Sequence, residues 1–378
     1  MALPPVKLSD FRISGQLGAG TTARVYDAVH LVTGAEAAIK MLEPSSDLHD
    51  MAAVAQMRER FAREALLLGN VRSRHVGTMT GFGFEKGQPF IVLEKLRGET
   101  LDAKLRRDGP VPVPIAITLI EQLLVGVSDC HDAQIIHRDI KPSNIFVHED
   151  GADSVVKLID FGVARLREIT NEIGALTNKN QLIGSMGYMA PEQFRDAGQV
   201  TYAADLYAVG VVVYRTFTGR LPFVSRSLDA VIRMKSESEV PSVSAMPNMP
   251  ESEMLDWFVK KAMAAKVEER FATAREMLDH WGTVMANLEV TDVSKNYGRV
   301  DESYAGVMAT RAPDDERTVV APPRPADMQA SEAPPETLAS PRANQLLEEE
   351  DLVTQNNPHL RDLVERELAL YRGKKQSG

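Results

Sequence analysis

The chain has 378 residues with a net charge of −10, and 44% of the residues are hydrophobic. This length exceeds one small domain and suits one large domain of roughly 270 residues with extensions. The acidic balance argues against a general nucleic-acid-binding protein, because a polyanion would be repelled.

The single cysteine, Cys130, excludes a disulfide framework within the chain and a cysteine-ligated metal site. We expect Cys130 to pack as a small apolar residue in a helix, which is consistent with a reducing compartment. No uninterrupted run of about 18 apolar residues occurs, and the N-terminus has no basic start followed by an apolar stretch. These features predict a soluble, cytoplasmic protein with no membrane partner and no nucleic-acid partner.

Short antiparallel strands are predicted in the first hundred residues, where apolar and polar positions alternate around glycines. The predicted ranges are 13–17, 25–29, 37–42, 77–84 and 89–93. A helix is predicted between the third and fourth of these, over residues 51–69, where apolar residues follow one helical stripe and Gly69 is a plausible stop.

After Gly98 the pattern becomes mainly helical. The most apolar window, 207–217, is broken by Gly210 and Arg215 and predicts a buried core helix instead of a membrane span. The predicted helices cover 101–107, 114–133, 203–218, 227–235, 251–264 and 272–288.

The predicted fold class is α+β with two lobes. After a leader, residues 1–10, residues 11–96 form a small antiparallel β-sheet lobe with one helix, and residues 97–288 form a larger, mainly helical lobe. Residues 289–343 are rich in proline and acidic residues and predict a disordered linker. A helical pattern returns over residues 344–373, before a short tail at 374–378.

The most informative motif is HRDIKPSN, residues 137–144, followed by DFG at residues 160–162. Transfer of the terminal phosphoryl group of ATP spreads negative charge over oxygens that already repel each other. This chemistry therefore needs positioning and positive charge. The oxygens of Asn144 and Asp160 suit Mg²⁺, which prefers oxygen ligands. Lys141 can neutralise a phosphate, and Asp139 then remains to orient an acceptor hydroxyl and accept its proton.

In these motifs the chain resembles the protein kinase superfamily, and in particular the eukaryotic-type (Hanks-type) serine/threonine kinases of bacteria. The resemblance covers roughly residues 11–285. It implies a two-lobed protein kinase fold that transfers the γ-phosphoryl group of ATP to Ser or Thr of proteins, including the chain itself. Lys141 favours these acceptors, because tyrosine kinases usually carry Ala or Arg in that region. The other matching segments are LGAGTTARVY (17–26), AAIK (37–40), FAREALLLGNV (61–71) and GSMGYMAPEQF (184–194).

The resemblance implies that a glycine-containing loop covers the phosphates of ATP, with Ala23 in place of the family's third glycine. Lys40 would contact the α- and β-phosphates and pair with a glutamate of the following helix. Glu59 and Glu64 are five residues apart, so they cannot both face the site, and the sequence context favours Glu64. The loop residues expected at the nucleotide are Leu17, Gly18, Gly20 and Val25.

The adenine pocket follows from the same resemblance. Ala38 would lie against the base, Leu93 at the back of the pocket and Phe146 beneath the base. Backbone groups of Glu94 and Leu96 would hydrogen-bond the edge of the base.

Residues 160–192 correspond to an activation segment. Arg138 would pair with a phosphorylated residue of this segment, with Thr177 as the first candidate and Thr170 as the second. Ser185 stands where the family usually has a threonine, whose hydroxyl bridges the residues corresponding to Asp139 and Lys141.

Further residues are expected to support the site. Asp205 would hydrogen-bond the catalytic-loop backbone, and Arg270 would pair with Glu192. We expect His137 to hold the loop by hydrogen bonds instead of transferring protons.

Two alternatives to an active protein kinase remain, an ATP-binding pseudokinase scaffold and a small-molecule kinase. The presence of all the residues whose loss usually disables the chemistry favours activity, and the Asp205 and Arg270 framework favours a protein kinase. In the tail, Thr318 of ERTVVAP would become a ligand for a phosphothreonine-reading module, such as a forkhead-associated domain, if it is phosphorylated. An unmodified linker threonine is the alternative. The segment 344–373 would dock on the kinase lobe, bind a partner or stay solvated.

Overall fold

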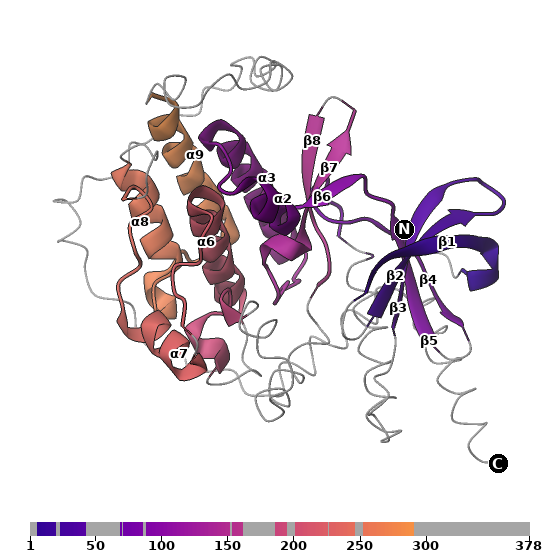
Figure 1. The fold of residues 1–378 in the computed structure, drawn as a ribbon, viewed down its shortest axis with the longest axis horizontal. Coiled ribbons are helices and arrows are strands. Elements are labelled where there is room, and N and C mark those ends of the chain that lie inside the picture. The colour runs from indigo at the N-terminus through magenta and orange to yellow at the C-terminus, as the bar shows by residue number, and fades with distance from the viewer. Residues whose placement is uncertain are drawn as a thin grey trace, which may run out of the picture.

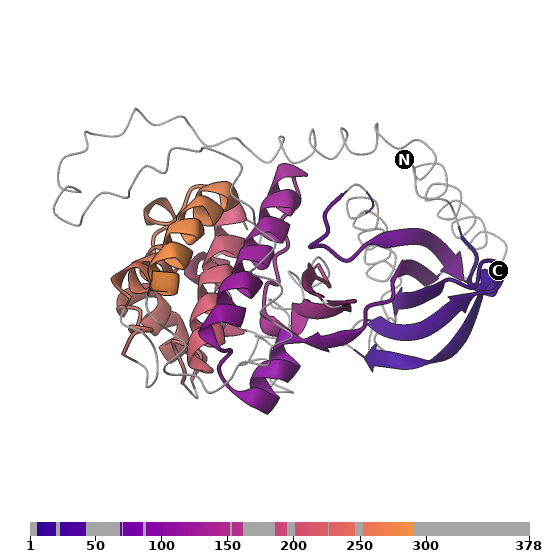
Figure 2. The same cartoon turned by 90° about the horizontal axis from the view of Figure 1, so that it is seen from above.

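The computed structural model describes residues 6–19, 23–42, 69, 71–85, 88–151, 153–161, 186–194, 201–225, 227–245 and 252–290. These residues form a β-sheet lobe and a mainly helical lobe that lie side by side, with a small second sheet between them (Figure 1). The view from above shows the same separation of strands from helices (Figure 2). The predicted α+β architecture with two lobes is confirmed.

The β-sheet lobe contains five antiparallel strands in the order β1-β2-β3-β5-β4. Each predicted strand overlaps one of them, because alternating side chains mark a sheet with one buried face. That face gathers the buried side chains of Ala28, Ile39, Phe90 and Val92. The bounds are β1 Phe11–Ala19, β2 Ala23–His30, β3 Glu36–Leu42, β4 Met79–Glu85 and β5 Gln88–Glu94. The helix predicted over 51–69 lies outside the described residues, apart from Gly69.

The end of the predicted leader packs on the sheet. The Val6 N–H donates a 3.2 Å hydrogen bond to Phe82 O on β4, and the short 3₁₀ turn η1, Leu8–Asp10, follows. At Gly83 an added Cβ would lie 2.3 Å from Val6 O, so only glycine permits this close approach.

A second sheet, with strand order β6-β7-β8, sits between the lobes. Its strands, Gly98–Thr100, Ile145–Asp150 and Asp153–Leu158, were not predicted, because the first has only 3 residues and polar residues interrupt the alternation of the other two.

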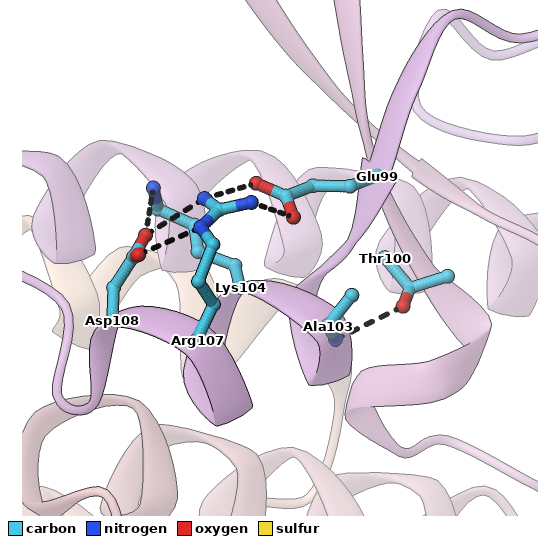
Figure 3. Close-up of polar contacts among 6 residues, drawn as sticks. All are labelled: Glu99, Thr100, Ala103, Lys104, Arg107 and Asp108. Atoms are coloured by element: carbon cyan, nitrogen blue, oxygen red, sulfur yellow. Dashed lines mark hydrogen bonds and ion pairs between the residues drawn. The ribbon is translucent and has the colours of Figure 1, made fainter.

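The junction from β6 into helix α2, Leu101–Asp108, is fixed by side chains (Figure 3). The Thr100 hydroxyl accepts a 3.2 Å hydrogen bond from the Ala103 N–H and caps the helix. Arg107 also reaches back from α2 to Glu99 with two hydrogen bonds of 2.7 Å.

The helical lobe is built around α6, which is buried almost throughout, as predicted for the window 207–217. At Gly210 an added Cβ would lie 2.8 Å from the Ala262 Cβ on α8, so glycine lets these two helices approach closely. The predicted helix ranges agree with α2 and with α3 Val113–Asp132, α6 Tyr202–Thr218, α7 Leu228–Glu237, α8 Glu253–Ala262 and α9 Ala274–Val290.

The core of this lobe centres on Trp281 of α9, which is fully buried. Its ring lies 5.0 Å from that of Phe258, and its indole N–H donates a 3.1 Å hydrogen bond to Ile117 O of α3. Truncating such a side chain to alanine typically costs about 3–5 kcal/mol. The three helices α3, α8 and α9 therefore form one packed unit around Trp281.

Helix α3 is the one helix of the described residues that could span a membrane by length and composition. Of its apolar window, 61% is buried inside the protein, a property that core helices share. Cys130, on this helix, is 1% exposed, and burial raises the pKa of its thiol well above the usual value. The expected packing role of Cys130 is confirmed.

Candidate active site

The loop that carries HRDIKPSN connects α3 to β7 and is hydrogen-bonded to Asp205 of α6. The Asp205 carboxylate is 1% exposed and accepts hydrogen bonds from the N–H of His137 at 2.7 Å and of Arg138 at 2.8 Å. His131 Nε2 lies 3.0 Å from the same carboxylate. Because Arg138 has a positive φ of 66°, which is unfavourable for a non-glycine residue, these bonds stabilise a strained turn next to Asp139.

His137 is buried and held by two backbone groups. Its Nδ1 accepts from the Asp139 N–H at 3.4 Å, and its Nε2 lies 3.2 Å from Ile159 O. Burial lowers the pKa of His137, so the neutral ring with a proton on Nε2 satisfies both contacts. The ring of Phe161 packs on it at 4.4 Å. The predicted supporting role of His137 is confirmed by these contacts.

A continuous chain of polar contacts joins five of the residues predicted to carry the chemistry. Lys40 Nζ lies 2.7 Å from Asp160 Oδ1, and the backbone carbonyl of Asp160 accepts a 3.4 Å hydrogen bond from Asn144 Nδ2. The same amide nitrogen donates to Asp139 Oδ2 at 2.8 Å, and Lys141 Nζ lies 2.8 Å from that oxygen. Residues separated by up to 120 positions in the sequence therefore meet at one place.

The charge of Asp160 is stabilised by its neighbours. Desolvation by the surrounding protein opposes ionisation, but the charge and hydrogen bond of Lys40 outweigh it and hold the pKa of Asp160 below its usual value. Asp160 also has a positive φ of 56°. Since such a conformation costs about 1–3 kcal/mol, it is retained only where the surroundings enforce it, as they often do at active sites.

The donor set fits a hard cation that brings its own water and phosphate ligands. Within the part of the chain that the structure describes, no group of three or more His, Cys, Asp or Glu is arranged so that it could hold a metal ion. Asn144 uses its amide nitrogen to hold the loop, so its amide oxygen is the atom that could join Asp160 as a ligand. One carboxylate and one amide oxygen suit Mg²⁺ better than a metal that needs a full protein cage.

The residues expected around the base and the phosphates lie on adjacent strands. Val25 of β2 is paired with Gly18 on one side and with Lys40 on the other. Ala38 and Leu93 are partners on β3 and β5. Leu17 lies near the end of β1, at the irregularity between Gln16 and Gly18, and is 54% exposed.

At the link between the lobes, the N–H of Glu94 donates a 2.9 Å hydrogen bond to Thr78 O. The carbonyl of Glu94 is therefore the backbone group of this residue that could contact a base. Leu96 follows in the connection between β5 and β6 and is half-buried. Phe146, on β7, is also half-buried and pairs with Thr100 of β6.

Sequence reasoning missed the role of the Glu94 side chain. Its Oε1 accepts from the Thr78 N–H and from Lys157 Nζ of β8, both at 2.7 Å. Although burial opposes ionisation, these contacts hold the pKa of Glu94 below its usual value. Glu94 thereby ties the sheet lobe to the second sheet beside the site. No signal in the sequence pairs residues so far apart.

The segment 186–194 is anchored to the helical lobe by an ion pair. Arg270 NH1 and NH2 lie 2.7 Å and 2.8 Å from the two oxygens of Glu192, and the Arg270 side chain is fully buried. The same guanidinium donates to Ala203 O at 3.0 Å and to Ala264 O at 2.8 Å. The expected pair is present, and Asp205 makes the expected contacts. Five of the other candidates, Gly20, Glu64, Thr170, Thr177 and Ser185, lie outside the described residues, as does Thr318.

Comparison with known proteins agrees with this arrangement. The protein kinase domain family model matches residues 11–281. Among curated proteins, the chain is 30% identical over 316 residues to the serine/threonine-protein kinase PknH of Mycobacterium tuberculosis, covering 83% of this chain and 46% of that protein. It is 32% identical over 273 residues to the serine/threonine-protein kinase PrkC of Bacillus subtilis, covering 70% of this chain and 40% of that protein. The chain thus spans less than half the length of these relatives.

The fold has a solved counterpart in the crystal structure of the Mycobacterium tuberculosis PknI kinase domain. The two superpose with a TM-score of 0.55 at 24% sequence identity, over 74% of this chain and 97% of that structure. At this identity the likeness supports the fold alone, whereas the family match covers more than half of the chain. The chain therefore belongs to the protein kinase family and is similar to its bacterial serine/threonine members.

Proposed function

We propose that this chain transfers the γ-phosphoryl group of ATP to serine or threonine hydroxyls of proteins, including its own. The observation that carries the proposal is the contact chain from Lys40 through Asp160, Asn144 and Asp139 to Lys141. It brings together one carboxylate, two ammonium groups and two side chains whose oxygens could bind a metal ion. These are the groups that phosphoryl transfer requires.

In the proposed step, the acceptor oxygen attacks the γ-phosphorus while the bond from this phosphorus to the β–γ bridging oxygen breaks. The hydroxyl proton goes to Asp139, and ADP leaves with the bridging oxygen. Lys141 faces the same Asp139 oxygen and would offset the charge of the transferred group. The products are ADP and a phosphorylated acceptor.

Lys40 and Asp160 neutralise each other in this structure. When nucleotide and metal bind, Lys40 would instead hold the α- and β-phosphates, and Asp160 with Asn144 would hold Mg²⁺. Lys40 and Asp160 would thereby each exchange one oppositely charged partner for another. Mg²⁺ would supply shielding of the negative charge that develops on the phosphates.

Three finer features belong to the same proposal. Phosphorylation of Thr177, or else of Thr170, would supply an anion for Arg138 and order the activation segment. Phosphorylated Thr318 would bind a phosphothreonine-reading domain. The reaction would take place in the cytoplasm, where ATP is supplied. Phosphopeptide mapping of the intact chain tests Thr177, Thr170 and Thr318. A chain that is never modified at Thr318 would remove that part of the proposal.

The proposal is tested by incubation with Mg²⁺ and γ-labelled ATP. We expect the intact chain to label its own Ser or Thr residues, and Asp139→Asn and Lys40→Met to lose labelling while remaining folded by circular dichroism. Lys260→Met is the matched control, because Lys260 lies exposed on α8, away from the site.

Equal labelling of the intact chain and Asp139→Asn would disprove the assignment. If the intact chain binds ATP but does not become labelled, the pseudokinase scaffold alternative is favoured instead.

A further inference from the structure

Helix α7 inserts a buried cation into the segment that precedes Pro191 and Glu192. Lys235 is 2% exposed, and its Nζ donates hydrogen bonds to Gly187 O at 2.7 Å and to Met189 O at 2.8 Å. The two carbonyls flank Tyr188. One ammonium group therefore holds both sides of a single residue.

The side chain of Tyr188 is held from a different helix. Its hydroxyl accepts a hydrogen bond from Arg215 of α6, and Arg215 NH2 lies 3.1 Å from the carboxylate of Asp102 on α2. Tyr188 is thus fixed through its side chain by α6 and through its flanking carbonyls by α7. The sequence 187–189 has little freedom to choose another conformation.

Burying the charged ammonium of Lys235 in these surroundings costs free energy. The ammonium lies 4.9 Å from the centre of the Tyr207 ring, and the Arg270 guanidinium lies 4.9 Å from the same centre. Arg270 repels Lys235, Glu192 attracts it, and burial lowers its pKa to about 7. Within the described residues no carboxylate forms an ion pair with Lys235. An apolar residue would cost less here, so a role beyond packing accounts for the lysine.

The anchored segment shares its support with the catalytic loop. Asp205, near the start of α6, holds the backbone before Asp139, while Arg215, near the end of α6, holds Tyr188. A polypeptide that brings a hydroxyl to Asp139 must lay its neighbouring residues over adjacent parts of the surface, and segment 186–190 is attached to the same helix.

We propose that Lys235 is a positioning residue that fixes the loop Gly187–Met189 in the conformation that receives the acceptor polypeptide. The inference rests on the proposed kinase function and deepens it. Lys235 does not touch the reacting atoms. It would act by keeping the two carbonyls turned inward toward α7, so that the outer face of the loop presents one shape to the acceptor.

The experiment measures steady-state kinetics on the full chain, with a peptide selected from a serine-centred library by the intact protein. Lys235→Met keeps the length and apolar character of the side chain but removes its donors. We expect KM for the peptide to rise about tenfold and KM for ATP to stay within twofold. Lys260→Met is again the matched control and should leave both constants unchanged. A rise in KM for peptide of less than twofold, or an equal rise in both constants, would overturn the proposal.

A second variant covers the case in which Lys235→Met does not fold. Lys235→Arg retains positive charge and donors, and we expect it to keep KM for the peptide within about threefold of the intact chain. A rise in KM for the peptide of about tenfold or more in a folded Lys235→Arg would count against the proposal.

Failure of the proposed function is recognised separately. If the intact chain phosphorylates no library peptide, the kinase assignment fails, and binding of the same fluorescent library is measured by anisotropy. Weaker binding by Lys235→Met than by the intact chain would still support the positioning role, and equal binding would overturn it.

Discussion

The carboxylate of Asp205 holds Arg138 in a left-handed backbone conformation through a 2.8 Å hydrogen bond from the Arg138 N–H. Arg138 directly precedes Asp139, so the orientation of the proposed base depends on a residue 67 positions away on another element. Precise placement of a reacting group accounts for much of the rate in such chemistry. The support of the loop is therefore as important as the base itself.

Substitution of Asp205 by asparagine should reduce both activity and stability. One acceptor oxygen becomes an NH₂ group that faces N–H donors, so a buried charge-assisted hydrogen bond is lost. We expect the free energy of unfolding to fall by about 2 kcal/mol and kcat to fall at least tenfold. Denaturant unfolding and labelling assays measure the two effects. Asp132→Asn is the control, since Asp132 is exposed and its ion pair with Arg275 is long, at 3.7 Å. Wild-type kcat in Asp205→Asn would refute the support role.

The Glu192–Arg270 pair should behave as one unit. Removing one partner leaves a buried charge uncompensated, so Arg270→Met should lower the free energy of unfolding by about 3 kcal/mol. In Arg270→Met with Glu192→Gln, the loss should be smaller than the sum of the single losses by at least about 1 kcal/mol.

A double-mutant cycle in urea measures this coupling. The exposed pair of Lys266 and Glu269 gives the comparison, because Lys266→Met should leave the free energy of unfolding almost unchanged. Strict additivity of the Glu192 and Arg270 substitutions would contradict the prediction.

Lys235 should give the protein a distinctive pH dependence of stability. Burial lowers its pKa from the ordinary value of 10.5 to about 7 in the folded chain. Between these values the unfolded chain binds more protons at this residue, so the free energy of unfolding should rise with pH, by at most about 1.4 kcal/mol per pH unit. The cost of burying the charge is complete below pH 7 and disappears above the ordinary value.

Urea unfolding of the intact chain and of Lys235→Met at pH 7, 8 and 9 isolates this effect. As the pH rises, the free energy of unfolding of the intact chain should increase relative to that of Lys235→Met. Arg270, Glu192 and Tyr207 face the same ammonium, and burial raises the pKa of the Tyr207 hydroxyl above its usual value. Parallel stability curves would show that Lys235 keeps an ordinary pKa.

The strands and helices that the sequence predicted correctly are those with a clear period. The alternation in β2 and β3 and the long apolar windows of α3 and α6 identify their elements without tertiary information, because one buried face imposes the pattern. Strands β6, β7 and β8 were missed, since their pairing with one another, and not a pattern of their own, makes them strands.

The sequence by itself determined the family, the two-lobed architecture and the residues Asp139, Asn144 and Asp160, because these depend on residue type and fixed spacing along the chain. Only the tertiary structure decided that Lys40 pairs with Asp160, that Glu94 binds Lys157 and that Lys235 is buried beneath Tyr188. These contacts join residues 46 to 120 positions apart. On a lone helix, Lys235 would be counted with the solvated charges. The packing of α7 against segment 186–194 removes the water and leaves two carbonyls as its partners.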